Sequence, residues 1–415
     1  MYRLQVSILN FPSIEFNIKS TSIKRYMGNN FRKNTEAMGL KTLIISILLV
    51  CVSCGRESKT GTDIKNETAY YLEKVDSIRI DRENRVRVLD FNPVSKRFLA
   101  FDQITQEFLL LDERGLVLEA VYRVGEGPNE YNSNLLAASF NHERGGYYTL
   151  SSRDFLWFNE NWEVEKRLRF APQFFIRFYS GPRFKVPYYT LPGDLEPYLF
   201  TNFFTSTNTG VIGEEGDITS EYLIELYNPQ KDSLEWVLPN DPQLLPEFEL
   251  DKENRQTKPV PLFVLDNEAK LMYLTFQRSG EIGVYDLAKG FALNEKVSFG
   301  GEDLIQSHNS RNTGLFHFSD GTLGILYFQG LSDAGVQTRR NSNPEYSAYS
   351  DPSLYRLILI GDGMQRGNGI GFPASCEPHS EIVQLPGNRI LLRDRYMEDN
   401  EPEYSTYSIF QLKFR

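Results

Sequence analysis

The sequence predicts an all-β protein that folds as a single β-propeller with six blades. Strand signals are dense and helical signals scarce from Ala69 to Arg415, one pattern of strands and turns recurs along this region, and one N-terminal strand has no neighbouring partner. A propeller blade is a four-stranded sheet of about 40–50 residues. The region is therefore long enough for a closed ring of blades.

Each copy of the recurrent pattern is a strand, a short polar gap, a second strand ending in an aromatic residue plus Asp or Asn, a tight turn and an outgoing strand. The clear copies comprise Phe98–Asp102, Glu107–Asp112 and Leu116–Tyr122; Tyr147–Leu150, Asp154–Phe158 and Trp162–Phe170; and Lys270–Phe276, Glu281–Asp286 and Phe291–Phe299. Weaker copies are Glu221–Asn228, Tyr355–Gly363 and the pair Arg389–Asp394 and Tyr404–Phe414.

The spacing of the turns indicates where the loops are long. The turns follow positions 112, 159, 228, 286 and 362, at intervals of 47, 69, 58 and 76 residues. Because a blade takes about 40–50 residues, we assign the excess to loops, notably 174–220 and 307–353.

The N-terminal strand Tyr70–Ile80 is the element that we expect to close the ring. Each blade buries its faces against its neighbours, so the first and last blades must meet. Tyr70–Ile80 has no partner of its own and could complete the sheet of the C-terminal strands that end at Arg415. Counting strands gives five or six blades, and we predict six. A pair of β-sandwiches is the alternative, but the loop lengths and the aromatic–Asp turns favour the propeller.

The segment before Gly55 is typical of a bacterial lipoprotein signal peptide. Lys41 supplies the positive charge, Leu43–Val50 the apolar core, and Val52-Ser53-Cys54 the cleavage context, with Cys54 as the lipid acceptor. The apolar run is too short to span a bilayer, which takes about 20 apolar residues. The alternative is a buried apolar segment of the fold, but the abrupt change to a polar tether argues against it.

This interpretation divides the chain into four parts. We interpret residues 1–37 as an over-extended, disordered start, because a signal peptide stands at the N-terminus and Met38 is a natural first residue. A genuine cytoplasmic extension is the alternative. The signal peptide is then 38–53, the polar tether 54–69 and the propeller domain 70–415.

Charge limits the partners of the chain. The whole chain carries −10 and residues 1–53 carry +5, so the part from Cys54 onward carries −15. Nucleic acids require a basic stripe, so they are excluded as partners. An anionic membrane surface also repels this chain, and attachment must come from lipid on Cys54, where stable anchoring takes two or more acyl chains. We expect an outer-membrane lipoprotein of the bacterial cell envelope.

The lipid-attachment signal, short polar tether and single acidic propeller resemble the six-bladed β-propeller lipoproteins of Bacteroidetes-type bacteria, many of which have no assigned function. The motif Val124–Tyr131, Val-Gly-Glu-Gly-Pro-Asn-Glu-Tyr, is similar to a Gly-x-Gly-Pro or Glu-Gly-Pro-Asn stretch in these relatives. The resemblance covers about 70–415. It implies a fold and a compartment but no activity.

The motif Val124–Tyr131 is also the first candidate binding site. Its two glycines and its proline are typical of a connection between blades that needs positive φ at glycine. The functional alternative places it at the central channel, where Arg123, Glu126 and Asn129 would present polar groups to a ligand. Loops on a rigid scaffold often carry function.

The second candidate site is aromatic. Most of the 23 Tyr and 29 Phe residues are expected to fill the space between wedge-shaped sheets. Tyr188, Tyr189 and Tyr198–Phe200 lie among prolines in a predicted long loop, and these are the aromatic residues that we expect to be exposed for stacking on a sugar or peptide. Packing in the core or within the loop is the alternative, and it is the interpretation that we favour.

The cysteines predict no disulfide in the propeller, because Cys376 is the only cysteine that follows Cys54. We expect Cys376 to be a buried, small apolar residue. The alternative is a catalytic thiol activated by His379.

The remaining motifs contain no catalytic signature, and we predict no metal, cofactor or catalytic residue. The histidines are His142, His308, His317 and His379, and none has the spacing of a zinc helix. A metal site assembled across blades stays an alternative, and His317 is expected in a strand beside an aromatic residue. Gly361–Gly367 lacks the third glycine of a dinucleotide loop and predicts a hairpin turn.

The sequence favours a lipid-anchored envelope protein that binds a peptide, a glycan or a partner protein and has no enzymatic activity. One alternative is an envelope hydrolase or lyase with a site in the propeller channel, and another is an extracytoplasmic sensor domain. Propellers host such sites without linear motifs. Three or more carboxylates or histidines converging in the channel would favour the hydrolase or lyase.

Overall fold

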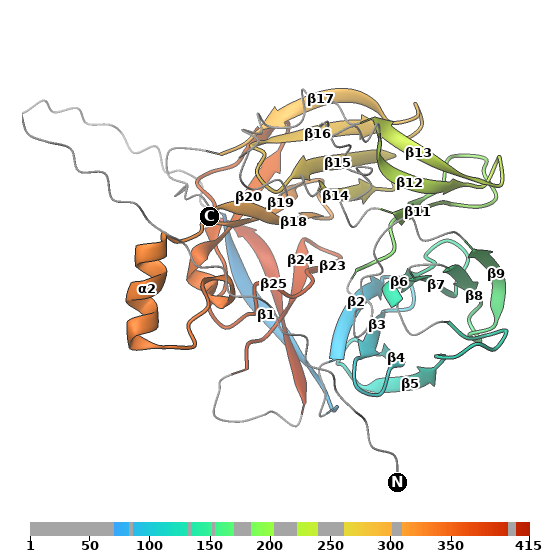
Figure 1. The fold of residues 1–415 in the computed structure, drawn as a ribbon, viewed down its shortest axis with the longest axis horizontal. Coiled ribbons are helices and arrows are strands. Elements are labelled where there is room, and N and C mark those ends of the chain that lie inside the picture. The colour runs from blue at the N-terminus through green and yellow to red at the C-terminus, as the bar shows by residue number, and fades with distance from the viewer. Residues whose placement is uncertain are drawn as a thin grey trace, which may run out of the picture. The chain divides into compact units, whose positions relative to one another are not determined.

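The computed structural model describes residues 70–82, 86–131, 135–151, 154–169, 184–202, 222–239, 261–300, 309–396 and 404–415. Within these residues the strands form six antiparallel sheets arranged as a ring (Figure 1), which confirms the predicted six-bladed propeller. The predicted start, signal peptide and tether, with the lipid acceptor Cys54, lie outside the described residues.

Each of the first three blades is a sheet whose strands follow one another from the innermost outward. Blade 1 contains β2 (Val86–Asn92), β3 (Arg97–Asp102), β4 (Glu107–Leu111) and β5 (Val117–Tyr122). Blade 2 contains β6 (Leu135–Phe140), β7 (Tyr147–Ser151), β8 (Asp154–Phe158) and β9 (Val164–Arg169). Blade 3 contains β10 (Tyr188–Tyr189), β11 (Tyr198–Asn202), β12 (Tyr222–Asn228) and β13 (Ser233–Pro239).

The second half of the ring follows the same order. Blade 4 contains β14 (Pro261–Asp266), β15 (Leu271–Phe276), β16 (Glu281–Asp286) and β17 (Ala292–Ser298). Blade 5 contains β18 (Arg311–His317), β19 (Leu323–Phe328), β20 (Tyr355–Gly361) and β21 (Met364–Gln365), and β22 (Ile370–Gly371) also pairs with β20. Blade 6 contains β23 (Val383–Leu385), β24 (Arg389–Arg393), β25 (Ser405–Phe414) and β1 (Tyr70–Ile80).

The ring is closed by pairing of the first strand with the last. In blade 6, β1 runs antiparallel to β25, with Tyr70 opposite Phe414 and Ile80 opposite Ser405, and the register shifts once, between Lys74 and Asp76. The predicted closure by the N-terminal strand is therefore confirmed.

The meander within each blade gives the ring two distinct ends. The innermost strands run from the connection with the preceding blade to the first hairpin turn of their own blade. We call the end where they begin the upstream end and the end where they finish the downstream end. Neighbouring innermost strands touch around the channel, as β2 does with β6 and β23, and β14 with β18.

The recurrent Asp and Asn residues make the same kind of turn in different blades. Oδ1 of Asp112 and Oδ1 of Asn159 each accept hydrogen bonds from the backbone N–H groups two and four positions further on, at 2.8–2.9 Å. Such short side chains replace a backbone acceptor in a tight turn. Similar acceptors are Asn92, Asp102, Asn141, Asn228, Asp266, Asp286 and Asp320.

The hydrophobic core lies between neighbouring blades, and the contact of blades 1 and 2 shows how it is built. Trp162 is 1% exposed; its ring stacks on Tyr147 with centroids 3.8 Å apart and on Phe108 with centroids 4.9 Å apart. Trp162 enters from the β8–β9 turn at φ 60, which is unusual for a bulky residue. Ring packing therefore outweighs a local backbone cost.

Two segments assigned to loops contain strands, so that part of the prediction is wrong. The segment 174–220 contains β10 and β11, and 307–353 contains β18, β19 and the exposed helix α2 (Asp333–Ser342). β10 has only two residues, and its place is set by pairing with β11 rather than by a local pattern. The predicted hairpin turn at Gly361–Gly367 is confirmed, between β20 and β21.

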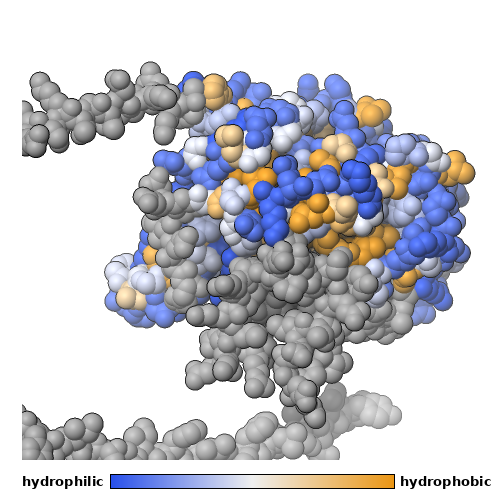
Figure 2. All heavy atoms as spheres, turned by 90° about the horizontal axis from the view of Figure 1, so that it is seen from above, coloured by the Kyte–Doolittle hydropathy of each residue, from blue (hydrophilic) through white to orange (hydrophobic). Residues whose placement is uncertain are grey.

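The surface is mixed in polarity. Figure 2 shows a face on which hydrophilic residues predominate and hydrophobic residues gather in a few places. Apolar atoms normally contribute a large share of the surface of a folded protein. In the described part of the chain, no helix has the length and apolar character needed to cross a membrane.

Candidate functional site

The innermost strand of blade 1 carries a carboxylate among apolar side chains. Asp90 lies in β2 between Leu89 and Phe91 and is 3% exposed. The register of β2 against β3 shifts between Val88 and Asp90, and such a β-bulge redirects side chains. A buried charge needs partners, and Asp90 finds them on blade 2 and on the segment that leads into blade 3.

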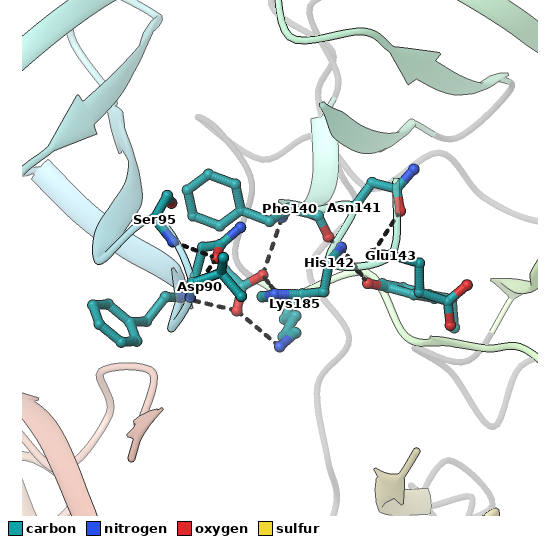
Figure 3. A network of polar contacts seen from close by, with 11 residues as sticks. Asp90, Ser95, Phe140, Asn141, His142, Glu143 and Lys185 are labelled. Carbon is teal, nitrogen blue, oxygen red and sulfur yellow. Dashed lines mark hydrogen bonds and ion pairs between the residues drawn. The ribbon is translucent and has the colours of Figure 1, made fainter. Parts of the chain in front are cut away.

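Both oxygens of Asp90 are saturated with donors (Figure 3). Oδ1 accepts a hydrogen bond from the backbone N–H of Phe91 at 2.9 Å and pairs with Nζ of Lys185 at 2.8 Å. Oδ2 accepts from the backbone N–H of Phe140 at 3.0 Å and contacts Nε2 of His142 at 2.9 Å. We call Asp90, His142 and Lys185 the downstream cluster, because Phe140 and His142 lie where β6 finishes.

Backbone and phenol contacts hold the cluster in place. The chain entering blade 3 runs beside β6, where the N–H of Ala138 donates to the carbonyl of Phe184 at 3.0 Å. Further along, the hydroxyl oxygen of Tyr188 accepts from the backbone N–H of His142 at 2.8 Å. The Asp90 side chain is 4% exposed, whereas Lys185 is 50% exposed. Lys185 is therefore the member of the cluster that solvent and ligands reach most easily.

Electrostatics fix the charge of Asp90. Burial alone would raise the pKa of its carboxyl, but the charges of Lys185 and His142 and their hydrogen bonds outweigh burial and lower the pKa from 3.8 to about 2. The carboxylate is thus ionised at neutral pH and can only accept hydrogen bonds. It follows that Nε2 of His142 carries the hydrogen in this contact.

The geometry of the downstream cluster suits ligand binding better than proton transfer by Asp90. Asp90 stays ionised and has no free acceptor site, so it is unsuited to act as a general acid or base. His142 is oriented by a carboxylate, as a general base would be, but no hydroxyl or thiol hydrogen-bonds to its ring in the portion of the chain that the structure describes. The cluster offers a fixed ammonium and a fixed imidazole beside the channel.

A second carboxylate–imidazole contact lies at the same end of the ring. Nε2 of His317, the last residue of β18, is 3.6 Å from Oδ2 of Asp266, the last residue of β14. The His317 ring stacks on Tyr273 with centroids 6.0 Å apart, so the predicted strand histidine beside an aromatic residue is confirmed. Burial lowers the pKa of His317, although Asp266 and Asp320 raise it.

The motif Val124–Tyr131 connects β5 of blade 1 with β6 of blade 2, as the interpretation of an inter-blade connection predicts, and its polar residues contact the outer part of blade 2. Nε of Arg123 donates to the backbone carbonyl of Trp162 at 3.3 Å, and Oδ1 of Asn129 accepts from the backbone N–H of Val164, in the outermost strand of blade 2, at 3.0 Å. The physical reason is that the motif leaves β5, itself an outermost strand. Glu126 is exposed. Ligand binding by these three residues stays a prediction.

The aromatic pair Tyr188 and Tyr189 is buried, so the expected exposure is wrong. Tyr188 is 4% exposed and Tyr189 is 3% exposed. Tyr189 stacks on Tyr198 with centroids 4.8 Å apart, and Leu199 and Phe200 are fully buried beside them. Pairing of β10 with β11 draws these rings into the core, as the packing alternative expected. A binding role for the pair stays untested.

The burial predicted for Cys376 is confirmed, since this residue is 0% exposed. Burial raises the pKa of the Cys376 thiol to about 12, with Ser375 and Asp394 as its nearest polar contacts at 3.8 Å. Among the described residues these two side chains, and not His379, hydrogen-bond to the thiol, so the activated-thiol alternative finds no support in this geometry. His308 lies outside the described residues.

Sequence reasoning missed Asp90 and Lys185 and gave His142 no role in a site. One signal was present: a single carboxylate in the apolar run Val88-Leu89-Asp90-Phe91, since Asp is rarely buried without a partner. In the residues that the structure describes, no three His, Cys, Asp or Glu side chains converge in a way that could hold a metal ion.

Comparison with known proteins identifies the fold only. No protein-family profile matches the chain, and no curated protein matches its sequence. A member of the DUF4221 family from Bacteroides vulgatus is similar in structure, with a TM-score of 0.57 and 10% identity over 84% of this chain and 99% of that chain. At that identity the likeness shows a shared propeller fold.

Enzymes with related propellers are more distant. A gluconolactonase from Xanthomonas campestris has a TM-score of 0.42 and 9% identity over 84% of this chain and 99% of that chain. A streptogramin B lyase has a TM-score of 0.42 and 7% identity over 83% of this chain and 98% of that chain. Likenesses this weak carry no argument about the chemistry of this chain.

Proposed function

We propose that this chain is an exported, lipid-anchored propeller of the bacterial cell envelope that binds a peptide, a glycan or a partner protein. The observation that supports the binding role is Asp90 of the downstream cluster, which is saturated with donors and ionised at neutral pH. It holds Lys185 and His142 in fixed positions and takes no part in proton transfer.

The downstream cluster has the properties of a binding site on a rigid scaffold. Its members come from blades 1 and 2 and from the chain entering blade 3, so their geometry is set by the ring itself. Lys185 is half exposed and keeps donors besides the one facing Asp90. A ligand with carbonyl, hydroxyl or carboxylate oxygens fits such donors.

Anchoring rests on the signal segment and the charge of the chain. Lipid on Cys54 is the attachment that suits a chain carrying −15 beyond residue 53. The test is fractionation of the producing bacterium together with intact mass of the protein. We expect the wild type in the membrane fraction with acyl groups on Cys54, and Cys54→Ala outside it. A wild-type protein that retains residues 1–53 without lipid would refute the anchor.

Binding is tested by crosslinking in intact cells. Lys185→Met is compared with Lys231→Met, which removes a surface lysine that is 65% exposed. We expect a specific envelope partner or glycan whose yield falls at least tenfold with Lys185→Met and is unchanged with Lys231→Met. Lys185→Arg, which keeps the charge, should restore part of the yield. Equal yields from Lys185→Met and Lys231→Met would refute binding at the downstream cluster.

One alternative function has an observation in its favour. The carboxylate-oriented imidazole of His142 suits a hydrolase or lyase. Such an enzyme would lose nearly all turnover with His142→Gln, whereas a binding protein has no turnover to lose. Screening ester, lactone and glycoside substrates with the wild type and His142→Gln distinguishes the two functions.

A further inference from the structure

The upstream end of blade 5 holds an arginine without a carboxylate partner among the described residues. Arg311 is the first residue of β18, and its guanidinium lies over the ring of Tyr349, with Cζ 4.6 Å from the ring centroid. Its buried Nε has no hydrogen-bond acceptor among the residues that the structure describes. An aromatic face holds a cation in place but accepts none of the in-plane N–H bonds of the guanidinium.

Two neighbouring arginines have carboxylate partners. Arg339, at the end of α2, forms an ion pair and a hydrogen bond with Asp351. Arg393, at the end of β24, forms an ion pair with Glu377, with Nε 3.6 Å from Oε2, and Nη2 of Arg393 donates to the hydroxyl of Tyr396; its Nε, like that of Arg311, makes no hydrogen bond among the described residues. Arg340 and Arg356, in the same region, donate to backbone carbonyls. Among the described residues, Arg311 combines the lack of a carboxylate partner with a buried Nε that has no acceptor.

An imidazole stands beside this arginine. The ring of His379 lies 6.3 Å from that of Tyr349 and 5.9 Å from that of Tyr355, and His379 is exposed. Tyr355 donates a hydrogen bond from its hydroxyl to the backbone carbonyl of Tyr349 at 2.8 Å, which holds the β19–β20 connection against the start of β20. Burial lowers the pKa of His379, Glu377 raises it and Arg311 lowers it, which places the Arg311 charge within electrostatic reach of the imidazole.

These groups come from separate connections that meet at one end of the ring. Arg311 opens β18, Tyr349 lies in the 3₁₀ turn Ala348–Ser350 between β19 and β20, and His379 lies between β22 and β23. Upstream connections of blades 5 and 6 thus present a guanidinium and an imidazole around one aromatic ring.

We propose that Arg311 and His379 form a carboxylate-binding site at the upstream end of blades 5 and 6. A carboxylate matches the planar fork of a guanidinium with two parallel hydrogen bonds, and the imidazole supplies one further donor. The carboxylate belongs either to the C-terminus of a peptide or to an acidic sugar. This site goes beyond the proposed function, because it depends neither on the anchor nor on the downstream cluster.

The experiment is calorimetric titration of the purified full-length chain with matched probes. One pair is an N-acetylated tripeptide with a free C-terminal carboxylate and the same tripeptide as its amide. The other pair is glucuronate and glucose, and inorganic phosphate is the remaining probe. The variants are Arg311→Gln, Arg311→Lys and the control Arg278→Gln. The control removes an exposed arginine from the β15–β16 turn. This turn lies close to Arg311, because the carbonyl of Gln277 accepts a hydrogen bond from the N–H of Asn312.

We expect at least one carboxylate probe to bind and its neutral counterpart to fail. Binding of the free tripeptide assigns a peptide terminus, and binding of glucuronate assigns an acidic sugar. Arg311→Gln should raise the Kd at least tenfold, which corresponds to about 1.4 kcal/mol, Arg311→Lys should raise it less, and Arg278→Gln should leave it within twofold. Circular dichroism should show all three variants folded.

The proposal is overturned by any of three results. The first is equal binding of acid and amide, or of glucuronate and glucose. The second is binding of phosphate without binding of either carboxylate probe. The third is an equal effect of folded Arg311→Gln and Arg278→Gln on the Kd. None of these results depends on whether lipid anchoring or Lys185-dependent crosslinking is found, so failure here is distinguishable from failure of the proposed function.

Discussion

Replacing Asp90 by Asn tests how strongly the downstream cluster holds the blades together. The substitution keeps the shape of the side chain and removes the charge that faces Lys185 and His142. It also places an NH₂ group where a carboxylate oxygen accepted hydrogen bonds from Phe91 or Phe140. A buried donor that faces other donors has no acceptor, and this mismatch adds to the loss of the ion pair.

The pKa of Asp90 sets the size of the effect. The pKa of the Asp90 carboxyl falls from 3.8 to about 2 when the chain folds. Each pKa unit corresponds to about 1.4 kcal/mol. The folded-state pKa is depressed, so the carboxylate contributes about 2 kcal/mol to the free energy of unfolding above pH 4. This contribution is lost as the pH falls from about 4 to about 2.

The assay is urea unfolding of wild type and Asp90→Asn at a series of pH values. We expect Asp90→Asn to be at least about 2 kcal/mol less stable at pH 7 and the difference between the two proteins to shrink as the pH falls below 4. The control is Asp362→Asn, a position 87% exposed in the β20–β21 turn, which should change stability by less than about 0.5 kcal/mol. A difference that does not vary with pH would refute the assigned role of the charge.

Three further predictions concern the packing of Trp162, the backbone at Gly146 and the thiol of Cys376. Trp162→Ala should lower the free energy of unfolding by about 3–5 kcal/mol because it empties a stacked site; a loss below about 1 kcal/mol in urea unfolding would contradict the packing. Gly146→Ala should lower the free energy of unfolding far more than Gly290→Ala. Both glycines have positive φ, 78 at Gly146 and 67 at Gly290. However, a Cβ at Gly146 would lie 2.0 Å from a backbone carbonyl oxygen, whereas a Cβ at Gly290 would meet nothing within 4 Å. Equal urea midpoints for these two glycine variants would contradict the prediction. Cys376, with its pKa raised to about 12, should resist a thiol reagent at pH 8 until urea unfolds the chain, and rapid labelling of the folded protein would count against its burial.

The blades could be predicted because their signals are local. The strand expected at Phe98–Asp102 is β3, Arg97–Asp102, and the turn expected after Asp112 exists because that side chain caps its own backbone. Closure by Tyr70–Ile80 could be predicted because a strand without a nearby partner must pair elsewhere.

The site could not be predicted in the same way, because its contacts join distant parts of the chain. Asp90 and His142 are 52 positions apart, and they meet only because blades 1 and 2 pack with their innermost strands side by side. Similarly, nothing in the sequence around Arg123 tells whether a connection runs at the rim or at the channel. That depends on the strand it leaves, and β5 is outermost only once the sheet order is known.

Pairing of β1 with β25 gives the ring a property that concerns synthesis rather than stability. Tyr70–Ile80 is made first among the strands, and its partner Ser405–Phe414 is made last, with Ile80 and Ser405 separated by 325 positions. Bringing such distant segments together costs loop-closure entropy that only the completed contacts repay. A chain that stops before β25 leaves the first strand unpaired and the ring open, so closure distinguishes finished chains from truncated ones.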